Sequence, residues 1–328
     1  MNNTVIRQAG KRTFWDRNNQ SEGYLLKKLI KQKTYVFLRA LLMFGLCMLI
    51  LQPILNKVSV TFMAEKDLYD TTVIAIPKNF TLHNLKQTAY LMNYWKTLVN
   101  TVWISLTVSL IQIIVCILVG YGFARFEFPL KRFWFACIIL LIIIPPQTLS
   151  TSLYLHFRYF DLLGIFRASL GRAINLKGSI LPYYMMCLGC MGLKNGLYIY
   201  MIRQYFRTVP KELEEAAYVD GCGILATFYK IMLPDAKPII TSCFLFSFVW
   251  QWTDSFYTKL FLGDIAVLSR QLTSLAERLR KYLETVTTAY SQAAISTGVL
   301  LTIIPLLILY IFAQRGFVES LSQTGIKM

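Results

Sequence analysis

Long apolar stretches alternate with polar, charged segments along this chain. A helix that crosses the ~30 Å hydrocarbon layer needs roughly 20 mainly apolar residues. Runs such as FWFACIILLIIIPP have no polar face to show to water, which disfavours a large soluble helical protein. The pattern therefore predicts an all-α polytopic membrane protein with six transmembrane helices. The stretches lie at about 35–55, 98–121, 134–155, 181–205, 240–261 and 293–313.

The segment before the first stretch is polar and basic, and no small-residue cleavage site follows that stretch. We therefore expect a retained arm rather than a cleaved signal peptide. Positive charges beside the first span favour the cytoplasmic side, and six spans would return the C-terminus there. The predicted organisation is a cytoplasmic basic N-terminal arm (1–34), then a transmembrane domain (35–328) that ends in a cytoplasmic C-terminal tail (314–328). Segments 122–133 and 206–239 would also lie inside, and segments 57–97, 156–180 and 262–292 outside.

Composition fits this reading. Of the 328 residues, 55% are hydrophobic, and 34 basic against 17 acidic side chains give a net charge of +17. A strongly basic protein can bind nucleic acid. Here much of the excess lies in the N-terminal arm and the short inner segments, where it fixes topology and meets anionic lipid. The sequence contains no nucleic-acid motif, so we expect the lipid bilayer, not nucleic acid, as its partner.

Candidate chemistry for an enzyme is sparse. The cysteines lie in apolar stretches or in the segment after the fourth, so we expect no structural disulfide, and the pair Cys187 and Cys190 is predicted to be apolar filler within a helix. His83 and His156 have no clustered partners, so no metal site is predicted. No Ser-His-Asp or paired-carboxylate arrangement has a persuasive context.

The segment 211–238, KELEEAAYVDGCGILATFYKIMLPDAKP, is the most distinctive polar part of the chain. Pro210 suits a first helical turn, and the acidic residues that follow suit the positive end of the helix dipole. Gly221 and Gly223 then interrupt the helix, and Pro234 and Pro238 stop a second one. The pattern predicts a helix, a sharp turn and another helix at the inner membrane face, whose small residues allow another surface to approach closely.

This segment resembles the EAA loop of bacterial ABC importer permeases. The matching positions are Glu215, Ala216, Ala217, Gly221, Ile231, Leu233 and Pro234, at the spacing of the family pattern. The stretches IPKNFTLHNLKQT, NTVWISLTVSLIQIIVCILVGYGFARFEFP, FVWQWTDSFYTKLFL and AQRGFVESLSQTGIK look like the carbohydrate-uptake branch of that family. More narrowly, they resemble the second permease of maltose and arabino-oligosaccharide importers. The resemblance runs from about residue 35 to the end.

The resemblance implies a type I ABC importer permease fold and a role in carbohydrate import, with oligosaccharides as the expected substrates, across the bacterial plasma membrane. In that family the EAA loop is the coupling helix, which seats in a cleft of a cytoplasmic ATPase. The residues implied to make this contact are Glu215, Ala216, Ala217, Asp220 and Gly221. The chain has no GxxxxGK[ST] phosphate loop, so ATP and Mg would bind to the partner, and no cofactor is expected in this chain.

The implied assembly contains a second non-identical permease, two ATPase subunits and an extracellular sugar-binding protein. Residues 266–284 have helical periodicity with charges on one side, which predicts a surface helix. The resemblance makes this outer segment a docking candidate for the binding protein.

The fifth apolar stretch carries a polar stripe, because Ser247, Gln251, Asp254 and Thr258 recur at helical spacing. Polar groups within spans usually face a cavity or a partner. Together with the flanking ring of Trp250, hydroxyl, amide and carboxylate groups suit a sugar, so these are candidates for the substrate pathway. The alternative is that the same groups bond to neighbouring helices.

The fourth stretch adds Lys194 and Asn195 as pathway candidates. One hypothesis pairs Lys194 with Asp254, since a lysine this deep needs a partner or water; the alternative is that it snorkels outward. Pro145 and Pro146 would bend the third stretch and Pro305 the sixth.

Other classes of function fit less well. A secondary transporter driven by an ion gradient could use Lys194 and Asp254 as relay groups, but no inverted repeat is visible. A membrane glycosyltransferase would need an acid, base or metal cluster at a membrane face. A purely structural scaffold leaves the loop spacing unexplained.

Overall fold

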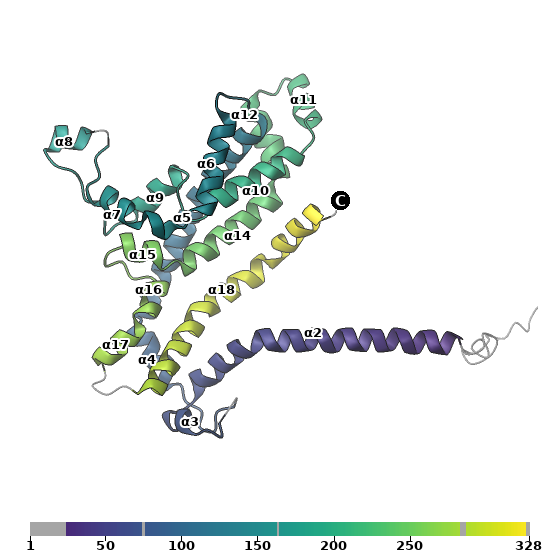
Figure 1. The fold of residues 1–328 in the computed structure, drawn as a ribbon, viewed down its shortest axis with the longest axis vertical. Helices are drawn as coiled ribbons and strands as arrows, with labels where there is room; N and C mark the ends of the chain where they lie inside the picture. Colours follow the sequence, from purple (N-terminus) through teal and green to yellow (C-terminus); the bar gives the residue numbers. More distant parts are fainter. Residues whose placement is uncertain (1–23, 74–75, 163, 283–286, 326–328) are drawn as a thin grey trace, which may run out of the picture. The chain divides into compact units, whose positions relative to one another are not determined.

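The computed structural model describes residues 24–73, 76–162, 164–282 and 287–325 (Figure 1). These residues are mostly helical, and their only β pairing consists of isolated antiparallel bridges between Met63 and Phe80 and between Phe160 and Ile174. The all-α prediction is therefore confirmed. The first 23 residues of the predicted basic arm lie outside the described residues.

The chain divides into two compact units, Met1–Ser59 and Val60–Met328. Helix α2 (Tyr24–Phe62) is the described part of the first unit and ends just inside the second. The remaining helices belong to the second unit. They are α3 (Glu65–Tyr69), α4 (His83–Leu91), α5 (Tyr94–Arg125), α6 (Lys131–Ile143), η1 (Pro146–Leu149), α7 (Ser150–Arg158), α8 (Ile165–Leu170), α9 (Leu181–Leu188), α10 (Asn195–Thr208), α11 (Glu212–Val219), α12 (Ile224–Thr227), η2 (Phe228–Met232), α13 (Leu233–Asp235), α14 (Lys237–Thr253), α15 (Phe256–Phe261), α16 (Leu268–Thr273), α17 (Leu275–Tyr282) and α18 (Thr288–Gly325).

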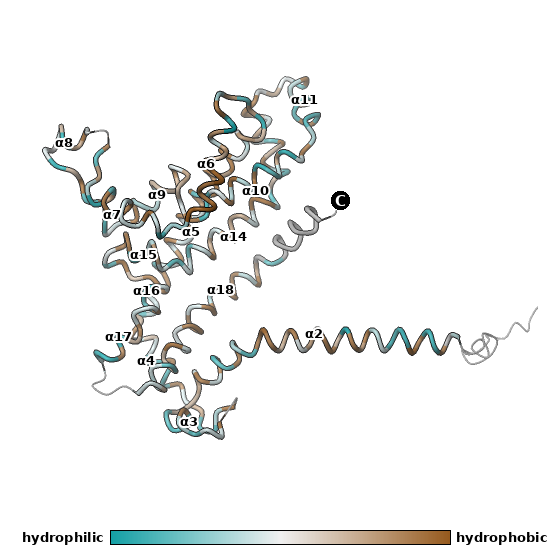
Figure 2. Tube along the Cα trace, in the orientation of Figure 1, coloured by the Kyte–Doolittle hydropathy of each residue, from teal (hydrophilic) through white to brown (hydrophobic). Residues whose placement is uncertain are grey.

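Three described helices are long and apolar enough to cross a membrane: Leu26–Phe62, Tyr94–Arg125 and Thr288–Phe312. Two further pairs pass the same test together, although each is sharply bent. Lys131–Ile143 meets Pro146–Arg158 at 100°, and Ile224–Asp235 meets Lys237–Thr253 at 73°. Helix α6 is the first half of one of these pairs, and Figure 2 shows that it is strongly hydrophobic. The described residues therefore support three to five spans, and the predicted number of six is not confirmed.

The fourth predicted span is wrong as a continuous helix. Helix α9 ends at Leu188 and α10 begins at Asn195, so the stretch 181–205 is broken in its middle. Cys190 and Lys194 both have left-handed backbone conformations, with φ of 59° and 64°, which a helix does not contain. Cys190 consequently lies in a turn and not in a helix.

The ends of two other predicted spans also differ from expectation. In the fifth stretch, α14 stops at Thr253 and the separate short helix α15 follows, so 240–261 is not one helix. In the third, the chain bends at Pro145 and Pro146 as predicted, because proline lacks the N–H that would continue the helix. Helix α18 continues through Pro305.

Helix α5 is the centre of the second unit and packs against α10 and α14, while α14 also packs against α18 (Figure 1). Cys116 of α5 and Tyr198, Ile199 and Ile202 of α10 are completely buried in this core. The closest approach is at Gly120, where an added Cβ would lie 2.8 Å from Cγ2 of Ile202. A glycine at this position lets the two helices come together.

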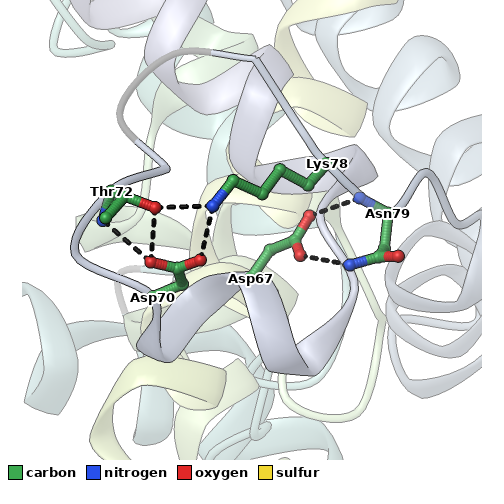
Figure 3. Close-up of polar contacts among 5 residues, drawn as sticks. All are labelled: Asp67, Asp70, Thr72, Lys78 and Asn79. Carbon is green, nitrogen blue, oxygen red and sulfur yellow. Dashed lines mark hydrogen bonds and ion pairs between the residues drawn. The ribbon is translucent and has the colours of Figure 1, made fainter.

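The predicted outer segment 57–97 is folded back on itself. Asp67 of α3 accepts hydrogen bonds of 2.7 Å from both the backbone N–H and the side-chain amide of Asn79, and Lys78 lies 2.7 Å from Asp70 (Figure 3). The Asn79 bonds hold the pKa of Asp67 below its usual value, and the bonds from Lys78 and Thr72 lower the pKa of Asp70. Both carboxylates are therefore ionised at neutral pH, where their bonds tie α3 and the residue after it to Lys78 and Asn79.

The helix predicted over 266–284 is present as two pieces, α16 and α17, which are separated at Ser274. Residues 283–284 of that prediction lie outside the described residues.

Candidate coupling loop and translocation face

The loop 211–238 has the predicted architecture of helix, turn and helix. Helix α11 ends at Val219, and Gly221 then turns the chain with a φ of +81°, a conformation that favours glycine. The N–H of Gly221 bonds to the carbonyl of Tyr218 at 3.0 Å, which closes the turn. Helix α12 and the π-helical turn η2 then lead through α13 to α14. The loop is thus a compact projection at one end of the second unit (Figure 1).

The predicted contact residues of the loop fall into two groups. Glu215, Ala216, Asp220 and Gly221 are exposed on the surface of the projection, whereas Ala217 is buried against the body of the protein. The side chain of Ala217 is therefore enclosed within this chain, while the other four residues are accessible to a partner.

An apolar patch at the turn was not predicted from the sequence. Val219 is 88% exposed and Leu225 is 73% exposed, and Ile224 stands between them in the chain. Exposed apolar residues grouped in this way mark an interaction surface. The available signal was that these residues interrupt an otherwise polar segment at its glycine corner.

A buried ion pair attaches the loop to α5. Nε of Arg125, the last residue of α5, lies 3.0 Å from Oε1 of Glu214, and both side chains are buried. The hydroxyl of Tyr121 donates a hydrogen bond of 3.2 Å to the same oxygen, and Nη2 of Arg125 donates one of 2.8 Å to the carbonyl of Val209. The sequence pattern predicts only a favourable interaction of the acidic residues after Pro210 with the helix dipole, so this role of Glu214 is a finding of the structure.

The ring of Tyr121 reinforces the same joint. Its centroid lies 5.2 Å from that of Phe206, in α10 before the loop, and 4.7 Å from that of Phe228, in η2 after it. One aromatic side chain on α5 therefore packs against both the helix before the loop and the helical turn within it. Together with the ion pair, this packing ties α10, α11 and η2 to α5.

Most of the predicted pathway residues are buried and bonded within the chain. Ser247 donates a hydrogen bond of 2.6 Å to Oε1 of Gln112, and the amide of Gln251 lies 3.4 Å from the same oxygen. Nε2 of Gln112 in turn bonds to Asn195 and, at 2.6 Å, to the carbonyl of Leu193. This polar network joins α5, α10 and α14, which is the helix–helix alternative that the sequence left open.

Asp254 and Lys194 have separate partners. Asp254 accepts a hydrogen bond of 2.8 Å from the hydroxyl of Tyr183, and its Oδ1 accepts one of 3.0 Å from the N–H of Phe256, at the start of α15. Nζ of Lys194 lies 5.0 Å from the centroid of the Trp250 ring. No ion pair joins Lys194 and Asp254 in the part of the chain that the structure describes, so that hypothesis is wrong.

The pair Lys194 and Trp250 differs from the other candidates because it is exposed. Trp250 is 45% exposed on α14, and Val249 and Thr253 beside it are also exposed. A lysine held over an indole ring forms a cation–π contact that leaves its ammonium hydrogens free to bond elsewhere. Of the predicted pathway residues, only Lys194 and Trp250 stand on an uncovered face.

Comparison with known proteins gives one matching family and several relatives. The family described as "Binding-protein-dependent transport system inner membrane component" matches residues 112–319. The arabinooligosaccharides transport system permease protein AraQ of Halalkalibacterium halodurans is 28% identical over 308 residues, covering 91% of this chain and all of the relative. The maltodextrin transport system permease protein MdxG of Bacillus subtilis is 26% identical over 313 residues, covering 94% and 99%.

The fold also occurs in a solved structure. A chain from the crystal structure of a bacterial ABC transporter involved in the import of the acidic polysaccharide alginate superposes with a TM-score of 0.64. The match covers 87% of this chain and 97% of that chain, with 17% sequence identity. At this identity the likeness shows a shared fold.

Proposed function

Since the chain belongs to the family of binding-protein-dependent transport system inner membrane components, we propose that it is the permease subunit of an ATP-driven carbohydrate importer. Oligosaccharides are the proposed substrate class, because AraQ and MdxG are named for arabinooligosaccharide and maltodextrin transport. The observation that carries the proposal is the exposed loop whose root is fixed to α5 by the buried pair of Arg125 and Glu214.

The proposed mechanism transmits a push from a separate ATPase. Glu215 and Ala216 on the exposed face of α11, and Asp220 and Gly221 in the turn after it, would seat in the ATPase together with the apolar patch around Val219. Because the anchor is stiff and buried, a displacement of the loop would move α5 and α10 as a body and not bend the loop. That movement would switch the access of the substrate pathway from one side of the membrane to the other.

The proposed assembly contains this chain, a second non-identical permease, two cytoplasmic ATPase subunits and an external sugar-binding protein. It would lie in the bacterial plasma membrane with the coupling loop and both termini in the cytoplasm. The C-terminal end of α18 points toward the same end of the unit as the loop, which supports this orientation of the C-terminus (Figure 1).

We place the substrate pathway along the exposed face that carries Lys194 and Trp250. A lysine within a membrane segment is costly where it faces lipid, so such a face belongs against a partner or an aqueous path. An indole ring stacks on the apolar face of a sugar ring, and an ammonium donates to its hydroxyls. Asn195, Ser247, Gln251 and Asp254 would support this face from inside the chain.

Reconstitution in proteoliposomes tests the proposal. The chain is purified with its second permease and ATPase, and uptake of labelled maltotriose and arabinotriose is measured with and without ATP and the binding protein. We expect uptake only when ATP and the binding protein are both present. Accumulation by the chain alone, driven by an ion gradient, would contradict the proposal.

Exchange of charge at Glu215 tests the coupling contact. In Glu215→Lys we expect the ATPase to be lost on purification, because a reversed charge would face its docking cleft. Glu277→Lys is the matched control, since Glu277 is exposed on α17, away from the loop. Equal retention of the ATPase by both variants would exclude Glu215 from the contact.

A further inference from the structure

A cavity of about 700 Å³ lies at the opposite end of α5 from the coupling loop. Its lining includes Lys96, Asn100 and Trp103 from the first turns of α5, Gln271 from α16 and Arg278 from α17. Helix α5 has 32 residues and is therefore about 48 Å long, so the cavity and the Arg125 anchor stand near opposite membrane faces. With the loop in the cytoplasm, the cavity opens outside.

Gln271 supplies an unused hydrogen-bond acceptor to this cavity. Its side chain is only 5% exposed, and its Oε1 has no hydrogen-bond partner among the described residues. A buried polar atom without a partner is unfavourable and is normally satisfied by protein, water or ligand. Oε1 itself is enclosed, but Gln271 lines the cavity, so a rotation of its side-chain amide would present this acceptor to a ligand that donates a hydrogen bond.

The other lining groups combine donors, an acceptor and an aromatic surface. Lys96 and Arg278 can donate hydrogen bonds, Asp264 can accept them, and Trp103 is 62% exposed. Arg278 is held in place, since its Nε donates to Oγ of Ser274 at 3.2 Å. Sugar hydroxyls both donate and accept, and sugar rings stack on indole, so this mixture suits a saccharide. The volume lies within the roughly 300–1,000 Å³ of small-molecule sites.

The wall of the cavity is preformed by a contact between two glycines. A Cβ on Gly263 would lie 2.8 Å from Cα of Gly178, and Gly263 has a φ of +53°. The N–H of Gly178 also bonds to the carbonyl of Phe261 at 2.7 Å, which fixes the two segments together. Backbone at such close range leaves the cavity little freedom to collapse.

We propose that this cavity is a saccharide subsite on the permease itself. It would hold one or two sugar units of the oligosaccharide after release by the binding protein and before entry to the face of Lys194 and Trp250. The subsite rests on the proposed function, because it presupposes that the importer carries carbohydrate. The buried acceptor favours a hydroxylated small molecule over a docked protein surface.

The test uses the complete importer in proteoliposomes, with labelled maltotriose and arabinotriose as probes. Gln271→Leu removes the acceptor, and Lys96→Gln removes the ammonium donor. We expect each to raise the KM for uptake about threefold to tenfold, as the loss of one hydrogen bond would. The ATPase rate at saturating sugar-loaded binding protein should stay unchanged. Thr273→Val is the control, because Thr273 is exposed on α16 but does not line the cavity.

The possible failures are distinguishable. If the wild-type importer takes up no saccharide, the proposed function fails and the subsite fails with it. If the wild type imports a probe and neither cavity variant changes its KM, the subsite alone is wrong. The cavity variants could instead lose only the stimulation of ATP hydrolysis by sugar-free binding protein. That result would also overturn the subsite, and it would make the cavity a docking site for the binding protein.

Discussion

Glu214 and Glu215 are neighbours in the sequence with opposite environments. Glu215 is exposed on α11, whereas Glu214 is buried and lies 3.0 Å from Nε of Arg125. The two carboxylates cannot share a face because consecutive helical residues point about 100° apart. The sequence motif draws attention to Glu215, but the structure gives Glu214 the role of holding the loop.

Neutralising Glu214 should lower the stability of the chain, whereas neutralising Glu215 should not. In Glu214→Gln, Arg125 remains buried without its counter-charge, and breaking such a pair costs about 3–5 kcal/mol. We expect a lower thermal unfolding midpoint for the detergent-solubilised protein and, in the assembled importer, ATP hydrolysis with reduced uptake per ATP. Glu215→Gln is the control and should leave the unfolding midpoint unchanged. Equal shifts in the two variants would contradict the anchor.

At the scale of elements, the packing of α5 on α10 depends on one small residue. Gly120 lies where an added Cβ would be 2.8 Å from Cγ2 of Ile202 and 3.2 Å from the backbone nitrogen of Arg203. The helices could be predicted from their apolar stretches, but the partner of each helix could not, since α5 and α10 are separated by more than 60 residues of sequence.

Gly120→Ala should force the two helices apart. Overpacking of this kind costs typically about 1–3 kcal/mol, which exceeds the helix-propensity gain of about 1 kcal/mol from replacing glycine. We expect a lower unfolding midpoint for Gly120→Ala. Gly122→Ala in the same helix meets no atom closer than 4.0 Å and should be neutral or stabilising. A destabilisation of similar size in both would show that the close contact is not responsible.

At the scale of the whole molecule, buried and exposed polar residues divide between holding the helices together and meeting partners. Gln112 collects Ser247, Gln251 and Asn195 into one network inside the bundle. Lys194 and Trp250 remain exposed, on a face that the described residues of the second unit leave open. In the proposed assembly such a face would meet the second permease, with the substrate path between the two.

Trp250→Ala should impair transport without unfolding the chain. Loss of the indole removes a stacking surface and leaves Lys194 without its cation–π contact, so we expect saccharide uptake by the reconstituted importer to fall at least tenfold. The unfolding midpoint should change little, since the ring is half exposed. Val249→Ala is the control on the neighbouring exposed position. Unchanged uptake in Trp250→Ala would remove this face from the pathway.

The sequence by itself determined that this is a helical membrane protein with an EAA-type loop. Apolar length fixes which segments can leave water, and the spacing of Glu215 and Gly221 fixes a helix and a corner. The predicted stop at Pro234 is wrong, because the helical segment runs through Pro234 and the chain bends only between Asp235 and Lys237. These properties depend on residues that are close together in the chain, so the sequence alone is enough to predict them.

Only the tertiary structure decided which polar residues face inward and where the apolar stretches break. The turn between α9 and α10 requires left-handed backbone at Cys190 and Lys194, which local preference disfavours and packing around Gly192 stabilises. The pairing of Glu214 with Arg125 likewise depends on α11 lying against the end of α5, nearly 90 residues away in the chain. Contacts between distant segments depend on how helices pack in three dimensions, and helical periodicity alone does not encode them.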